Sequence, residues 1–72
     1  MPIVQKRFLR TITIQDNYSY RLLDVGAGTN HWLEAEPITR GCITRTAENE
    51  EVLRILLEND ALRLTREQQR VR

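Results

Sequence analysis

Residues 40–64, RGCITRTAENEEVLRILLENDALRL, decide the fold because they carry the clearest strand and helix signals of the chain. A strand over residues 41–45 is followed by Thr46, whose hydroxyl can cap the first turn of a helix. Three acidic residues then favour the positive end of that helix: Glu48, Glu50 and Glu51. The segment therefore predicts a strand and then a capped helix that ends near Asn59 and Asp60.

The expected helix carries apolar residues at helical spacing. They are Val52, Leu53, Leu56 and Leu57, with Ile55 at the edge of the stripe. Because a short helix cannot bury such a stripe alone, we expect it to cover one face of a sheet. Beyond it, Leu62 and Leu64 alternate with Arg63, which predicts a short final strand or an extended docking segment.

The first half of the chain predicts the sheet. Apolar and polar residues alternate over residues 5–14, 18–25 and 31–36, and Phe8, Ile12 and Ile14 are expected to share a face. The pair Asp16-Asn17 favours a turn, and residues 26–30 form a glycine-containing loop. The predicted fold is α+β: a small antiparallel β-meander of four to five strands packed against one amphipathic helix, in two layers.

A chain of 72 residues forms one domain, which we place at residues 1–64, followed by a basic C-terminal tail at residues 65–72. In the tail, Thr65 and Gln68 have capping-box spacing, so we expect a frayed helix or a segment ordered on binding. A domain this small buries only about 60% of its unfolded surface. With Cys42 and His31 as its only cysteine and histidine, a partner chain is the favoured source of further stability.

Composition excludes several classes of protein. With 40% hydrophobic and 29% charged residues, the chain is too apolar for a disordered protein, and no apolar run approaches a membrane span. The basic N-terminus has no apolar region after it, so we expect a soluble protein of a reducing compartment, in a virion or a host cytoplasm. The net charge is +1, distributed as a basic start, an acidic helix and a basic tail.

Candidate catalytic residues lack the neighbours that their chemistry needs. His31 is expected at the exposed start of a strand, and Cys42 as a small buried apolar residue rather than a nucleophile. Gly26 and Gly28 do not complete a dinucleotide-binding fingerprint, because a strand follows them. We therefore expect a protein that is not an enzyme and that has no cofactor and no metal site.

A protein-binding surface is the favoured function. Tyrosine, tryptophan and arginine anchor many interfaces, and the candidate contact residues are Arg7, Arg10, Tyr18, Tyr20, Trp32, Arg66 and Arg70. We expect residues 1–10 and 65–72 to dock on neighbouring molecules. Nucleic-acid binding is a weaker alternative, because the acidic helix and the small net charge disfavour phosphate contacts.

The stretch GCITRTAENEEVLRILLEND resembles a pattern of small tailed-phage proteins, over residues 41–64. In that pattern a glycine-led strand ends in threonine, an acidic capped helix follows, and a short strand closes the domain. The resemblance implies a virion accessory or structural part, such as a capsid decoration, head–tail joining or tail protein. Such a protein forms a homo-oligomer or docks on a larger capsid or tail protein. The alternative is a small inhibitor or regulator of a host or defence protein.

Overall fold

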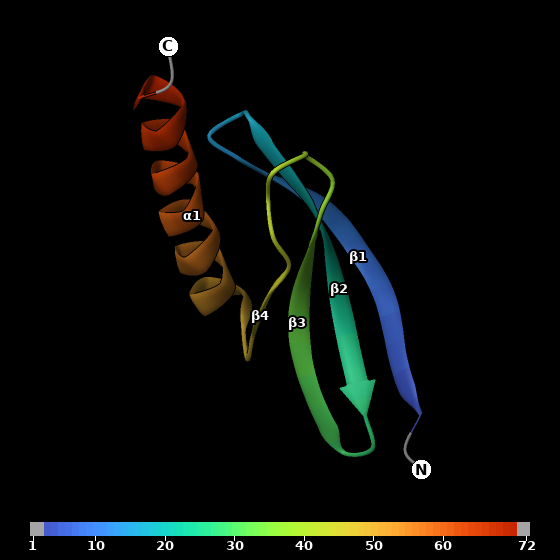
Figure 1. Ribbon diagram of the computed structural model, residues 1–72. Coiled ribbons are helices and arrows are strands. Elements are labelled where there is room, and N and C mark those ends of the chain that lie inside the picture. The colour runs from blue at the N-terminus through green and yellow to red at the C-terminus, as the bar shows by residue number, and fades with distance from the viewer. Residues whose placement is uncertain (1–2, 71–72) are drawn as a thin grey trace.

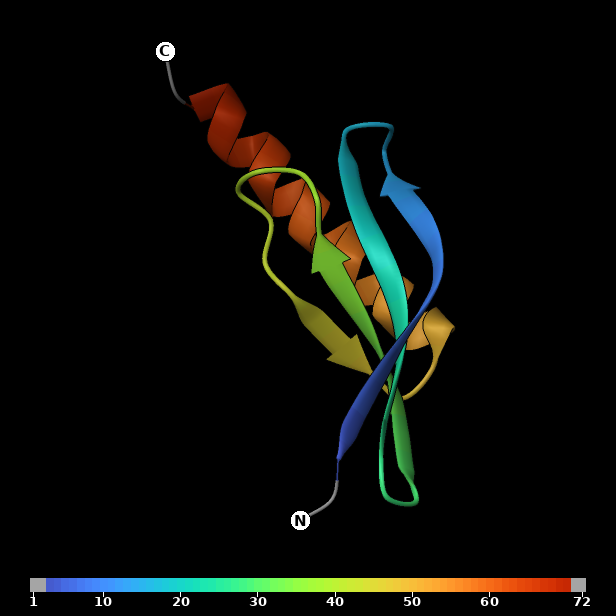
Figure 2. The same ribbon diagram turned by 90° about the vertical axis from the view of Figure 1, so that its right-hand side faces the viewer.

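The computed structural model describes residues 3–70, which form a four-stranded sheet and one helix (Figure 1). In chain order the elements are β1 (Val4–Ile14), β2 (Tyr18–Ala27), β3 (Asn30–Pro37), β4 (Arg45–Ala47) and α1 (Glu50–Arg70). All neighbouring strands pair antiparallel in the order β1-β2-β3-β4, and α1 crosses one face of the sheet diagonally (Figure 2). The predicted α+β meander with one helix is confirmed.

Two tight turns join the first three strands. Gln15 and Asp16, between β1 and β2, have φ values of 54° and 59°, which suit the right-handed twist of a hairpin. Gly28 begins the two-residue turn between β2 and β3 with a φ of 64°. Both turn regions follow the sequence prediction, although Gly26 and Ala27 belong to β2 rather than to the loop.

A β-bulge in β1 reverses which side chains face the helix. Phe8 pairs with Leu23, whereas Arg10 pairs with Leu22, so Leu9 is an extra residue between them. Leu22 faces α1, and its neighbour Leu23 faces the opposite side of the sheet. Residues that pair across two strands share a face, so Phe8, which pairs with Leu23, also faces away from α1. The prediction that Phe8 shares a face with Ile12 and Ile14 is wrong, because uninterrupted alternation takes no account of a bulge.

The core lies between α1 and the sheet face that it covers. Leu53, Leu57 and Ala61 of α1 are completely buried. They pack with buried side chains of the first three strands: Ile12, Ile14, Tyr18, Tyr20, Leu22 and Ala35. Leu56, which the sequence places in the apolar stripe, is only half-buried, because it lies at the flank of the contact.

The helix begins later and ends later than the sequence predicts. Its N-cap is Asn49, whose Oδ1 accepts a hydrogen bond from the Val52 amide at 2.9 Å, while the predicted cap Thr46 lies in β4. α1 continues through Asn59 and Asp60, so the predicted strand at residues 62–64 is wrong. The predicted tail is, over residues 65–70, the end of the same helix, and residues 71–72 lie outside the described part.

The segment between β3 and β4 is a loop where the sequence predicts a strand over residues 41–45. Ser19 of β2 holds its start: the Ser19 carbonyl accepts from the Ile38 amide at 2.9 Å, and the Ser19 amide donates to Thr39 Oγ1 at 2.8 Å. Gly41 then turns the chain with a φ of 93°. As a result, pairing with β3 begins only at Arg45.

A buried ion pair fixes α1 against β4. Arg45 donates to both carboxylate oxygens of Asp60, at 2.7 and 2.8 Å, and the Asp60 side chain is 7% exposed. This donation lowers the pKa of Asp60, although its burial opposes the shift. Nearby, burial raises the pKa of Tyr20, and the thiol of Cys42 adds to the increase, so the phenol stays neutral. Asp60 therefore connects α1 to β4 through Arg45 and does not end the helix.

The packing predicts unequal losses of stability for two helix positions that lie two residues apart. Leu57→Ala removes a fully buried side chain, so we expect the free energy of unfolding to fall by about 2–5 kcal/mol. Ile55→Ala, at a side chain that is 55% exposed, should change it by less than about 0.5 kcal/mol in a dilute sample. Urea denaturation measures both, and equal losses would contradict the orientation of α1.

The Arg45–Asp60 pair predicts acid sensitivity. The pKa of Asp60 is lower in the folded state than in the unfolded chain. The ionised carboxylate therefore stabilises the folded state fully above about pH 4. That effect is lost as the pH falls through the lower, folded-state pKa. Asp60→Asn should lower the melting temperature at pH 7 and flatten its decline below pH 4. An unchanged acid profile would show that another carboxylate is responsible, and Glu67→Gln, at an exposed position of α1, is the control.

Candidate protein-binding surface

The predicted contact residues do not come together in one patch. Tyr18 and Tyr20 are 5% and 0% exposed, so the structure does not support them as surface contacts. Arg7 and Arg10 lie on β1, Trp32 on β3 and Arg66 on α1, and the side chain of Arg70 lies outside the described part. The tyrosines face inward because their strand positions coincide with the face that α1 covers, which alternation alone does not reveal.

Arg10 lies where β1 meets the start of α1. It forms an ion pair with Glu50, which also accepts a hydrogen bond from Arg54 at 3.2 Å. These two donors lower the pKa of Glu50, with the hydrogen bond from Arg10 as the largest cause. The guanidinium of Arg10 is thus engaged within the chain, and it orders the junction between sheet and helix more than it offers a free charge.

The sheet face opposite α1 is partly apolar and carries its own ion pairs. Leu23 and Val25 are 6% and 1% exposed there, beside the half-buried Trp32. Lys6 pairs with Glu34 at 3.1 Å, and Arg21 lies 3.9 Å from Glu36 and 5.2 Å from the centre of the Phe8 ring. Since each of these cations has a carboxylate neighbour, this face offers little net positive charge to a phosphate backbone.

β1 forms one edge of the sheet, and the short strand β4 forms the other. β1 pairs only with β2, and every residue from 4 to 11 is exposed. Large apolar side chains gather along it: Ile3, Val4, Phe8 and Leu9, with exposures of 77%, 54%, 49% and 38%. An unpaired edge with apolar side chains is a template for strand addition by another chain. The sequence predicts residues 1–10 as a docking arm, and it places Phe8 on the same face as Ile12 and Ile14.

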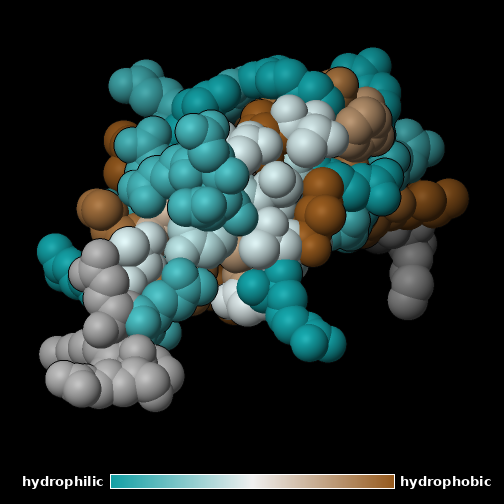
Figure 3. Space-filling model, turned by 90° about the horizontal axis from the view of Figure 1, so that it is seen from above, coloured by the Kyte–Doolittle hydropathy of each residue, from teal (hydrophilic) through white to brown (hydrophobic). Residues whose placement is uncertain are grey.

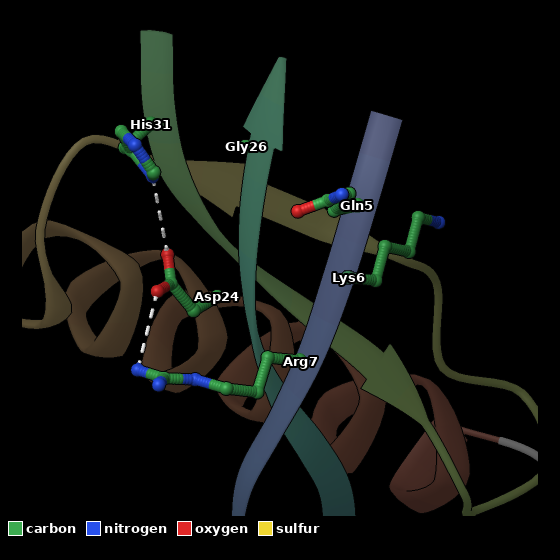
Figure 4. Close-up of a pocket in the computed structure, with 6 residues that line it drawn as sticks. All are labelled: Gln5, Lys6, Arg7, Asp24, Gly26 and His31. Carbon is green, nitrogen blue, oxygen red and sulfur yellow. Dashed lines mark hydrogen bonds and ion pairs between the residues drawn. The ribbon is translucent and has the colours of Figure 1, made fainter. Parts of the chain in front are cut away.

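The start of β1 also borders an open hollow (Figure 4). Gln5, Lys6, Arg7, Asp24, Gly26 and His31 line it. Asp24 lies between two cationic or basic groups, 3.5 Å from Arg7 and 3.8 Å from Nδ1 of His31. Gly26 makes room for the imidazole, because a Cβ there would lie 3.0 Å from His31 Cε1. His31 is thus packed over a glycine, and no hydroxyl or thiol nucleophile is among these six lining residues.

The side of the molecule seen from above carries hydrophobic side chains that are dispersed. Seen from above, they form separate spots among hydrophilic residues (Figure 3). Besides the β1 group, Ile38 and Ile43 of the loop before β4 are 54% and 49% exposed. Four of the exposed large hydrophobic residues therefore lie at or beside the start of β1.

Comparison with known proteins adds no relative. No protein-family model matches the chain, and neither a similar curated protein nor a similar solved structure was found. Separately, α1 is not apolar enough over its length to cross a membrane, within the residues that the structure describes.

The half-buried position of Trp32 predicts a moderate role in stability. Truncating a fully buried aromatic side chain costs about 3–5 kcal/mol. Because Trp32 lies on the uncovered face and remains partly exposed, we expect Trp32→Ala to cost about 1–2 kcal/mol and leave a cooperative transition. Urea denaturation followed by circular dichroism measures this, and complete unfolding of the variant would show that the uncovered face contributes a second core.

Proposed function

We propose that this protein is a non-enzymatic protein-binding module that docks on a larger partner through the edge of β1. The observation that carries the proposal is the unpaired outer edge of β1, exposed from residue 4 to residue 11. A partner strand there would gain main-chain hydrogen bonds, and the apolar side chains of Val4, Phe8 and Leu9 would gain contacts. The bulge at Leu9 limits regular pairing to the part of the edge that precedes it.

The charges on β1 favour a different protein over a second copy at this edge. Lys6, Arg7 and Arg10 lie within one short run, so pairing β1 with another β1 would bring like charges close together. A partner strand with apolar and acidic side chains avoids that repulsion. The acidic side chains of such a partner would lie near Lys6 and Arg7, which already pair with Glu34 and Asp24 of their own chain. These exposed ion pairs would therefore add little, and apolar contact would supply most of the affinity.

The setting that the sequence resemblance implies is a phage-like particle. There the chain would act as a structural or accessory component, such as a capsid decoration, head–tail joining or tail protein. The alternative is an inhibitor or regulator of a host or defence protein that binds through the same edge. Stoichiometry separates the two, since a particle component repeats in an array and an inhibitor occupies one or two sites on its target.

A matched pair of variants tests the role of the edge. The double substitution Val4→Asp with Phe8→Asp places two charges on exposed edge positions that are 54% and 49% exposed. The control is Ile43→Asp, at a residue of equal exposure outside the sheet. Each tag-free protein is purified gently from cells that make its natural partners, and native mass spectrometry records its complexes.

We expect the wild type and Ile43→Asp to retain a complex with a larger protein, and the edge variant to lose it while staying folded. If the edge variant retained the complex, β1 would not be the docking site. If the co-purified partner were nucleic acid, and its affinity fell steeply with increasing salt concentration, the proposed function would be nucleic-acid binding instead of protein binding.

A further inference from the structure

Helix α1 has a second apolar face that its own domain does not cover. Val52, Ile55 and Leu62 are 44%, 55% and 49% exposed, whereas the fully buried residues of α1 point to the sheet. At 100° per residue, these three side chains lie on the side of the helix opposite Leu57. Because α1 lies on one side of the sheet (Figure 1) and Leu57 points to the sheet, this side of the helix faces away from the strands.

The outward face has the spacing of a coiled-coil seam. Val52, Ile55, Asn59, Leu62 and Arg66 are separated alternately by three and four residues, which is the a and d pattern of a heptad repeat. The buried residues Leu53, Leu57 and Ala61 fall at other heptad positions. One helix therefore carries two apolar stripes, one for its own sheet and one unpartnered.

We propose that this outward face of α1 pairs with the same face of a second copy, as a parallel two-helix coiled coil. Asn59 would meet its counterpart at an a position, where a polar residue sets register and the number of strands at some cost in stability. Val52 at a and Leu62 at d are types that favour two strands, and Ile55 at d is the one departure from that preference.

The charges beside the seam select the parallel orientation. Glu58 and Arg63 are both exposed, at the g and e positions. In a parallel pair, Glu58 of each copy lies beside Arg63 of the other, because these positions are five residues apart. In an antiparallel pair centred on Asn59, the two Glu58 side chains would lie beside each other, which is repulsive.

Two heptads make a short seam, but packing on the sheet lowers the entropic cost of dimerisation because α1 is already folded. An isolated helix must fold as it pairs, whereas α1 is already held along the sheet by Leu53, Leu57 and the Arg45–Asp60 pair. The dimer would have the layer order sheet, helix, helix, sheet. The dimer would leave the β1 edge of each copy open, so dimerisation is independent of the proposed edge contact. It would also give the assembly two docking edges in place of one.

Sedimentation equilibrium over a range of concentrations tests the dimer. We expect Ile55→Asp with Leu62→Asp to weaken self-association by about 100-fold or more, because each substitution occurs twice in the dimer. Ile43→Asp is the control and should dimerise like the wild type. Far-ultraviolet circular dichroism verifies that each variant is folded. A wild type that stays monomeric at every concentration, or equal dimerisation by the double variant, would overturn the proposal.

Charge exchange tests the orientation. Glu58→Arg alone and Arg63→Glu alone should each weaken the dimer about 10-fold, and the double exchange should restore it, because the cross-helix pairs then reverse sign. In an antiparallel pair, Glu58→Arg would merely replace one like-charge contact with another. Single variants that associate as well as the wild type would therefore exclude the parallel seam.

Disulfide capture gives a second test of orientation. In a Cys42→Ala background, Val52→Cys should form a covalent dimer on mild oxidation, because the two copies of an a position lie close together in a parallel seam. The matched control is Arg54→Cys, a position two residues away on the side of the helix. Equal capture of both variants, or none of the Val52→Cys variant, would contradict the proposed pairing.

Discussion

The packing of one helix on one face of the sheet is the contact on which the rest of the structure depends. Leu53, Leu57 and Ala61 close over Tyr20 and Ala35, and all five side chains are completely buried. A single helix can bury only one side of a sheet. Consequently the opposite face, the outer edge of β1 and the outward side of α1 are not covered by the helix that forms the core.

Polar contacts decide where that helix lies and how far it extends. Asn49 caps its first turn, and the Arg45–Asp60 pair ties its middle to β4. Thr65, whose hydroxyl lies 3.3 Å from the Tyr18 hydroxyl, keeps the last turns beside β2. These contacts hold α1 as a straight element of 21 residues, so its outward residues keep fixed positions relative to the sheet. A weakly packed helix could not present a regular seam.

The first three strands, both hairpins and the fold class follow from the sequence, because alternation and turn residues act locally. Features that depend on contacts between elements do not. The bulge at Leu9 depends on pairing with β2, and the continuation of α1 through Asn59 and Asp60 depends on Arg45, which lies far away in sequence. The burial of Tyr18 and Tyr20 depends on which face the helix covers. As a result, the sequence does not reveal that the two tyrosines are buried, and the docking role of residues 1–10 stays a prediction.

Hydrogen exchange of the dilute, monomeric chain tests most directly whether one covered face holds the fold together. Mass spectrometry after pepsin digestion resolves the strands and the helix. We expect the slowest exchange around Tyr20, Leu22 and residues 53–61, and much faster exchange over residues 4–8, which have one neighbouring strand and no helix above them. Uniform protection along β1 and β2 would contradict this expectation, because the edge would then not be an open, weakly held element.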